Sequence, residues 1–200
     1  MTSNLKFNLG LALVGGLVYA ATKAMGEGYY VLVAFYIAQY IVLATAWNIL
    51  GGYGGYVNFG SAGFFAIGAY STVFFYKLLG LQSLKNLSFL GMNLDASHLM
   101  YLVLPAAIAM GALISGLVGL ATGYLTLRLR GVYFAISTLA LSVVVMTLVL
   151  NWSFVGGARG AYIIKPAQAA GFSSSGDLVF ATMLLVAMAA LWIARTIERS

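Results

Sequence analysis

Apolar residues run along this chain in six long blocks, separated by shorter stretches that hold most of the charges and prolines. The blocks cover Phe7–Gly26, Tyr29–Leu50, Val57–Leu79, Met100–Leu127, Val132–Asn151 and Leu178–Ala194. A hydrocarbon core of about 30 Å needs about 20 helical residues, and each block meets or approaches that length. The blocks lack the ten-residue alternation of membrane barrels. The pattern predicts an all-α, polytopic membrane helical bundle with about six transmembrane helices.

Composition narrows the class of protein. Hydrophobic residues make up 62% of the 200 positions and charged residues 7%, whereas soluble domains carry about 25% charged residues. The ten Lys and Arg residues lie mostly at the ends of apolar blocks, where they act as topology signals and head-group anchors. We therefore expect membrane lipids, and no nucleic acid, as partners. Cysteine is absent, which excludes disulfide and thiolate chemistry from this chain.

The distribution of cations predicts an orientation. If the N-terminus is cytoplasmic and all six blocks cross, the short inner segments hold five cations: Lys6, Arg128, Arg130, Arg195 and Arg199. The longer outer loops hold three: Lys85, Arg159 and Lys165. The higher density inside favours an arrangement with both termini in the cytoplasm. The first block, which follows Lys6, also has features of a signal peptide, so retention of the first helix stays open.

An enzymatic function finds little support in the residues. None of the four acidic residues lies in the middle of a block, and the one histidine, His98, is expected in a loop. No cluster has metal-ligand spacing, and no nucleophile elbow or phosphate loop occurs. We expect no catalytic residue, no metal and no cofactor bound by this chain. Because ion-coupled transporters usually hold charges inside a span, any energy for transport is expected from another subunit.

Glycines form the clearest local pattern. Gly51, Gly52, Gly54 and Gly55 interrupt helix continuity and predict a hinge, either a sharp turn or an unwound segment. Gly119 and Gly123 have the spacing at which helix backbones approach closely in lipid. Ordinary membrane packing is the alternative for each. At the end of the fourth block, Gly131 is expected to supply the positive φ for a tight turn.

Polar residues inside the blocks are candidates for lining a permeation path. They are Asn48, Asn58, Ser61, Ser137 and Thr138. Helix–helix hydrogen bonding is the alternative for each of them. Asn58 and Ser61 directly follow the glycine cluster and are expected about one helical turn apart, on one face.

Three stretches carry a family resemblance. They read GGYGGYVNFGSAGFFAIGAY at Gly51–Tyr70, LRLRGVYFAISTLA at Leu127–Ala140 and VGGARG at Val155–Gly160. In this order they resemble the branched-chain amino acid permeases of ABC importers, the LivM-type branch more than the LivH type. The resemblance extends over roughly Tyr29 to Ser200. Two positions depart from the family pattern: Asn58 stands where Ser is common, and Ser61 where His is common.

The resemblance implies a permease in a bacterial-type inner membrane. Its expected partners are two cytoplasmic ATPase subunits, which use ATP and Mg, a second homologous permease, and a periplasmic or lipid-anchored substrate-binding protein. Arg128, Arg130, Arg195 and Arg199 would face the ATPases or anionic head groups, with simple positive-inside topology as the alternative. Residues 1–200 are expected to form a single transmembrane permease domain. Because the chain stops where the family's ATPase-docking segment would start, it is expected to be the N-terminal part of a longer permease.

Other functions remain open at this point. Permeases for urea and short amides share the scaffold, and the departures at Asn58 and Ser61 leave the substrate undecided. A passive channel or facilitator should show a duplicated glycine-rich half, which these 200 residues lack. A non-transporting structural subunit should lack polar positions in its spans, and the polar candidates argue against that reading.

Overall fold

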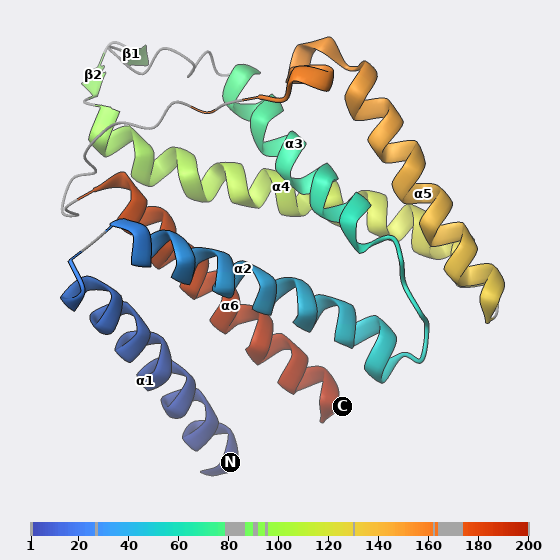
Figure 1. Cartoon of the computed structure of the whole chain (residues 1–200), viewed down its shortest axis with the longest axis horizontal. Helices are drawn as coiled ribbons and strands as arrows, with labels where there is room; N and C mark the ends of the chain where they lie inside the picture. The colour runs from blue at the N-terminus through green and yellow to red at the C-terminus, as the bar shows by residue number, and fades with distance from the viewer. Residues whose placement is uncertain are drawn as a thin grey trace. The chain divides into compact units, whose positions relative to one another are not determined.

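The computed structural model describes the backbone of residues 2–26, 28–78, 87–89, 92–94, 96–129, 131–161, 163 and 174–199. Side chains are described for residues 7–26, 28–78, 103–129, 131–161, 163 and 174–199. The chain forms two compact units (Figure 1). One comprises Met1–Gly55 and Phe172–Ser200, and the other comprises Tyr56–Gly171.

The first unit is a group of three long helices. Its elements are α1 (Thr2–Ala24), α2 (Gly28–Asn48) with a π-helical turn η1 (Ile49–Tyr53) continuing from it, and α6 (Ser175–Glu198). Helix α6 packs along α2 and also against α1 (Figure 1). The buried apolar side chains of α6, which include Leu178, Phe180 and Ala187, form the core of this unit.

Helices α1 and α6 pack antiparallel, with contacts along most of their length. Tyr19 and Phe180 stack with ring centroids 6.0 Å apart. A Cβ atom added at Gly15 would lie 2.8 Å from the sulfur of Met188. The Arg195 guanidinium lies 5.2 Å from the centroid of the Phe7 ring. The contacts on α6 move toward its C-terminus as those on α1 move toward its N-terminus.

The described residues of the second unit form three long helices, a small hairpin and two short 3-10 turns. Its elements are α3 (Ser61–Leu78), β1 (Leu87–Phe89), β2 (Met92–Leu94), α4 (Ala96–Thr126), α5 (Val132–Asn151) and the short 3-10 turns η3 (Ser153–Val155) and η4 (Gly157–Arg159). The strands are antiparallel, with Ser88 opposite Asn93. Helix α3 contacts both α4 and α5.

Small and hydroxyl residues bring α3 and α4 close together. A Cβ atom at Gly111 of α4 would lie 3.0 Å from the backbone oxygen of Gly68 on α3. Thr72 donates its hydroxyl to the Gly68 oxygen at 3.0 Å and approaches the Ala107 oxygen at 3.4 Å. Ser115 donates across the interface to the Phe64 oxygen at 3.2 Å. This is how membrane helices associate without a hydrophobic driving force between them.

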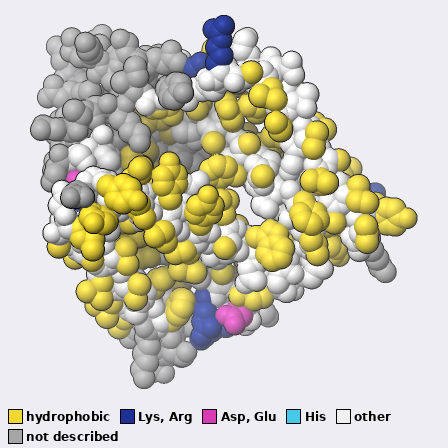
Figure 2. All heavy atoms as spheres, in the orientation of Figure 1, with side chains coloured by type: hydrophobic (Ala, Val, Ile, Leu, Met, Phe, Trp, Pro, Cys, Tyr) yellow, Lys and Arg dark blue, Asp and Glu magenta, His cyan; other side chains and the backbone are white. Residues whose placement is uncertain are grey.

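The prediction of an all-α membrane bundle with about six helices is confirmed, with the short β1–β2 hairpin as an addition. Among the described residues, five helical segments are long and apolar enough to cross a membrane: Phe7–Ala24, Gly28–Tyr53, Val103–Thr126, Val132–Asn151 and Ser175–Glu198. Helix α3, with 18 residues, is the shortest of the six long helices. Hydrophobic side chains cover much of the described surface in Figure 2, where charged side chains are few.

Some expected boundaries were wrong. Helix α5 has the predicted bounds, but α3 begins at Ser61 instead of Val57. Helix α4 begins at Ala96, so His98 lies in its first turn and not in a loop. Helix α6 begins at Ser175, three residues before the apolar block, because the Ser174 hydroxyl accepts the Asp177 N–H at 3.2 Å and caps the helix.

Candidate functional site along helix α5

The glycine cluster at the end of α2 does not break the helix at its first glycine. The π-helical turn carries the chain through Gly51 and Gly52 to Tyr53. A Cβ atom at Gly54 would lie 2.6 Å from the Leu50 carbonyl oxygen, and Gly55 has φ of +71°. Other residues rarely adopt that backbone conformation. The helical conformation of this segment therefore ends at Gly54 and Gly55, and the assignment of the cluster as a hinge stays a prediction.

Asn58 holds the following residues out of the helical conformation. Its side-chain oxygen accepts the N–H of Gly60 at 2.7 Å, and Asn58 is only 7% exposed. Such a local bond favours a turn over a helix. The Gly60 carbonyl then accepts the Phe64 N–H at 3.1 Å and starts α3. The expectation that Asn58 and Ser61 share one helical face was wrong, because Asn58 lies before the helix and Ser61 is its first residue.

The segment before α3 docks on α5 through two hydroxyl groups. Phe59 donates its N–H to the Thr138 hydroxyl at 3.1 Å, and its carbonyl accepts the Ser142 hydroxyl at 3.1 Å. Thr138 and Ser142 are four residues apart and share a face of α5. An extended backbone at membrane depth needs partners for its polar groups. Side chains of α5 supply both partners at Phe59.

Glycines allow this segment to approach α5 closely. A Cβ atom at Gly60 would lie 3.3 Å from the Thr138 Cβ, and one at Gly63 would lie 3.1 Å from the Ser142 Cα. One turn earlier on α5, the rings of Tyr56 and Phe134 pack with centroids 4.9 Å apart. The stretches at Tyr56–Tyr70 and Val132–Ala140, noted separately in the sequence, therefore meet along one face of α5.

The third glycine-rich stretch lies just beyond the C-terminus of α5. Gly156 has φ of +104° and Gly157 has φ of +54°, which lets η3 and η4 follow one another directly. A Cβ atom at Gly156 would collide with the carbonyl oxygen of Gly160. Lys77 near the end of α3 donates to the Phe154 carbonyl at 2.7 Å. All three family-like stretches thus contribute to the packing around α3 and α5.

The remaining path candidates lie in different environments. Thr138 is 4% exposed and close to Asn58 through the Phe59–Gly60 backbone. Ser137 lies on another face of α5 and donates to the Tyr133 carbonyl at 2.8 Å. Asn48 is exposed at the end of α2, with its oxygen over Gly52. The assignment of these residues to a path stays a prediction.

The structure also describes the glycines that were predicted to pack between helices and most of the arginines that were predicted to be cytoplasmic. A Cβ atom added at Gly119 would lie 3.9 Å from the ring of Phe64, and one added at Gly123 would lie 4.0 Å from the Leu127 side chain.

Arg128 donates to the Tyr124 hydroxyl at 2.8 Å. Arg195 pairs with Glu198 at 3.0 Å. Arg199 is exposed, and Arg130 lies outside the described residues. Gly131 has the predicted positive φ, at +60°.

Sequence reasoning missed Ser142, Gly60 and Gly63 as parts of the docking. A signal for Ser142 existed, since it lies one helical turn from Thr138. Gly68 and Gly111 were missed as the close approach between α3 and α4. They belong to different helices, so no spacing within one helix could reveal that they meet.

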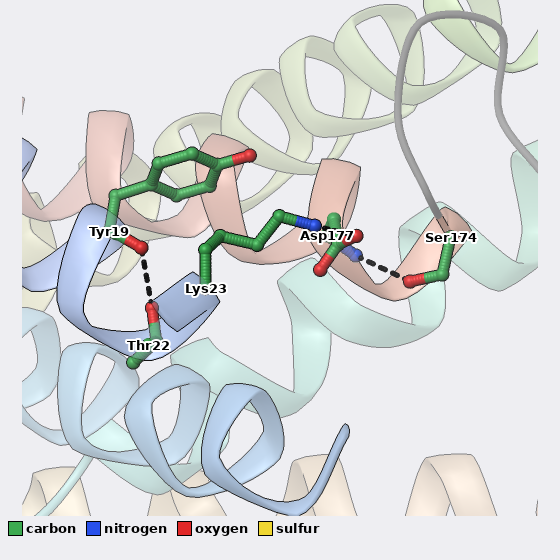
Figure 3. Close-up of polar contacts among 5 residues, drawn as sticks. All are labelled: Tyr19, Thr22, Lys23, Ser174 and Asp177. Atoms are coloured by element: carbon green, nitrogen blue, oxygen red, sulfur yellow. Dashed lines mark hydrogen bonds and ion pairs between the residues drawn. The ribbon is translucent and has the colours of Figure 1, made fainter. Parts of the chain in front are cut away.

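In the first unit, an ion pair joins α1 and α6. Lys23 Nζ lies 2.6 Å from Asp177 Oδ2, and the Asp177 side chain is 6% exposed (Figure 3). Lys23 lies in the last turn of α1 and Asp177 lies in the first turn of α6, so each charge is favoured by the dipole of its own helix. In the described part of the chain, His, Cys, Asp and Glu side chains form no group of three that could hold a metal ion.

Comparison with known proteins identifies the family. Residues 29–197 match the family described as branched-chain amino acid transport system / permease component. Over 129 residues the chain is 33% identical to the high-affinity branched-chain amino acid transport system permease protein LivM of Salmonella typhimurium. This alignment covers 64% of the chain and 25% of the relative, so the chain spans about a quarter of that relative's length. No solved structure matches the chain. The chain therefore belongs to the branched-chain amino acid permease family of multi-pass membrane proteins.

Proposed function

We propose that this chain is part of the permease subunit of an ABC importer for branched-chain amino acids. The single observation that carries the proposal is the family match over residues 29–197. Two of the family-like stretches supply Phe59 and Thr138, which bond to each other where the segment before α3 meets α5. In this role the permease provides a path and moving helices, and no catalytic residue.

Energy for transport comes from partner subunits in this proposal. Two cytoplasmic ATPases hydrolyse ATP with Mg, a second homologous permease completes the path, and a periplasmic or lipid-anchored binding protein delivers the substrate. Both termini of this chain face the cytoplasm. The proposal places Arg128 and Arg195 on that side. Their contacts with Tyr124, Phe7 and Glu198 hold their charged groups near the helix ends.

The substrate is a branched-chain amino acid in this proposal, with urea or a short amide as the alternative. The departure at Asn58 gives the alternative no separate support, because the Asn58 oxygen bonds the Gly60 N–H and serves the backbone. The name of the LivM relative also refers to branched-chain amino acids.

Reconstitution of the full-length protein with the products of its neighbouring genes tests the proposal. Proteoliposomes are given labelled leucine, urea or acetamide, with and without binding protein and ATP. We expect leucine uptake that requires both, and no uptake with an ATPase subunit inactivated in its phosphate loop. Uptake that needs no ATP would favour a facilitator. ATP-driven uptake of urea or acetamide without leucine uptake would favour the amide alternative.

A further inference from the structure

Helix α5 has a face that the packing of its own unit does not use. Its buried face carries Phe134, Thr138 and Val145, with Ser142 half-buried beside them. Residues three or four apart share a face of a helix. Two further faces are exposed, and they differ sharply in chemistry.

The first of these faces carries hydroxyl and amide groups toward both of its ends, and it is exposed except at the half-buried Ser137. Tyr133, Ser137, Thr147 and Asn151 follow one another at helical spacing, with Ala140 and Val144 between them. We call these six residues the polar stripe. Tyr133 is 73% exposed. At about 1.5 Å per residue the polar stripe is about 27 Å long, close to the hydrocarbon thickness of a bilayer.

The second exposed face is apolar at the same depths. Its residues, which we call the apolar stripe, are Ile136, Leu139, Val143, Met146 and Leu150. Each member of this row is close in sequence to a member of the polar stripe, so both rows cover the same range along the helix axis. The apolar stripe is suited to lipid, and the polar stripe is not.

Three polar side chains of the stripe donate to carbonyl groups of their own helix. Ser137 donates its hydroxyl to the Tyr133 carbonyl, Thr147 donates to the Val143 carbonyl at 2.9 Å, and the Asn151 amide nitrogen donates to the Thr147 carbonyl at 2.8 Å. The hydroxyl hydrogens of Ser137 and Thr147 are used in these bonds, whereas their oxygens keep acceptor capacity and the Asn151 amide has a second N–H. Such oxygens suit water and the ammonium group of a zwitterion.

We propose that the polar stripe of α5 is a wall of the water-filled translocation path and contacts a small zwitterionic solute during transport. The proposal rests on the proposed function and adds the surface that the solute meets. A wall of neutral dipoles without fixed charge gives weak contacts at several depths, which lets a solute enter and also leave. The apolar stripe of the same helix faces lipid or an apolar partner.

Cysteine labelling of the full-length permease, in membranes with Cys-free partner subunits, tests this directly. The 200 residues of this chain contain no cysteine, so Ser137→Cys, Thr147→Cys and Asn151→Cys each add one thiol to them. Ile136→Cys, Val143→Cys and Leu150→Cys are matched controls at nearly the same depths. The probe is a membrane-impermeant, positively charged methanethiosulfonate. We expect the stripe thiols to react about tenfold faster or more, because the thiolate forms in water and is suppressed in apolar surroundings.

Protection of the thiols from labelling by bound substrate gives a second measurement. Excess leucine should slow labelling at Ser137→Cys and Thr147→Cys and leave the controls unchanged. Equal reactivity of both rows, or reaction at Asn151→Cys alone, would overturn the proposal. Unreactive stripe thiols that cross-link to the second permease would show a partner helix on this face and would also overturn it.

Leucine uptake by the Cys-free protein separates this proposal from the proposed function. Labelled stripe thiols without leucine uptake would leave the aqueous wall standing and reject the importer of branched-chain amino acids. Leucine uptake with unlabelled stripe thiols would support the importer and reject the aqueous wall. Chromatographic behaviour like that of the unmodified protein ensures that each variant is folded.

Discussion

Lys23 and Asp177 form an ion pair of 2.6 Å between the last turn of α1 and the first turn of α6. The pair ties α1, which lies outside the family match at residues 29–197, to a helix inside that match. Asp177 is buried, and Lys23 remains about one-third exposed. Burial of one carboxylate makes its partner important, because an unpaired buried charge is costly.

Replacing Lys23 by Met should destabilise the protein more than replacing both partners. We expect Lys23→Met to lower the free energy of unfolding, because the buried Asp177 carboxylate loses its partner, but by less than for a fully buried pair because Lys23 is partly exposed. The double variant Lys23→Met/Asp177→Asn should recover part of that loss, because no charge is left buried. Unfolding of the purified protein in a denaturing detergent measures both values. Additive losses in the two single variants would show that the pair contributes no coupling.

Thr138→Val should weaken the docking of the segment before α3. Valine has a similar shape but cannot accept the Phe59 N–H, which would lose its partner at 3.1 Å. The expected cost is about 1–3 kcal/mol for an unsatisfied backbone donor. Thr45→Val is the control, because the exposed Thr45 hydroxyl bonds only the Ile41 carbonyl of its own helix among its described contacts. Melting temperatures in mild detergent compare the two, and an equal effect would contradict the docking.

Gly63→Ala and Gly116→Ala should have opposite effects on stability. At Gly63 the added methyl group would lie 3.1 Å from the Ser142 Cα, and backbone cannot move away cheaply. Overpacking of this kind costs about 1–3 kcal/mol. At Gly116 the added methyl group meets nothing within 4 Å, and alanine is favoured over glycine in a helix by about 0.5–1 kcal/mol.

The same unfolding assay, run on both glycine variants side by side, gives the sign of each change. Stabilisation by Gly63→Ala would mean that α3 and α5 do not approach as described. Destabilisation by Gly116→Ala would point to a contact with a partner subunit on that face of α4.

Gly156→Ala should disrupt the turn that follows α5. Gly156 has φ of +104°, and an added Cβ atom would collide with the Gly160 carbonyl oxygen. Strain and overlap together are expected to cost about 2 kcal/mol or more. Ala158→Ser, at an exposed position in the same turn, should stay within about 0.5 kcal/mol of the parent protein. Protease sensitivity of the purified protein measures local opening, and equal sensitivity of both variants would reject the strained turn.

Much of the fold was predictable because it depends on local pattern. The apolar blocks located all six long helices, and the block at Val132–Asn151 matched α5 at both ends. The start of α3 was missed by four residues. Its position depends on the bond from Gly60 to the Asn58 side chain, and the apolar pattern around Val57 carries no sign of that bond.

The candidate site was less predictable because its residues act across helices. Asn58 and Thr138 were both expected to line a path, and the described structure buries them on either side of the Phe59–Gly60 backbone. Ser137, their neighbour in the same prediction, lies half-buried on another face of α5. One residue along a helix turns a side chain by about 100°, so only the contacts of α5 separate these two hydroxyls.

The sequence by itself determined the class of protein, the number of long helices and the family-like motifs, because hydrophobic length and local glycine patterns do not depend on distant contacts. Tertiary structure alone decided which polar groups serve packing and which remain exposed. It also decided that Lys23 meets Asp177 and that Gly68 meets Gly111. These outcomes depend on which surfaces meet, and residues far apart in sequence carry no shared periodicity that would reveal it.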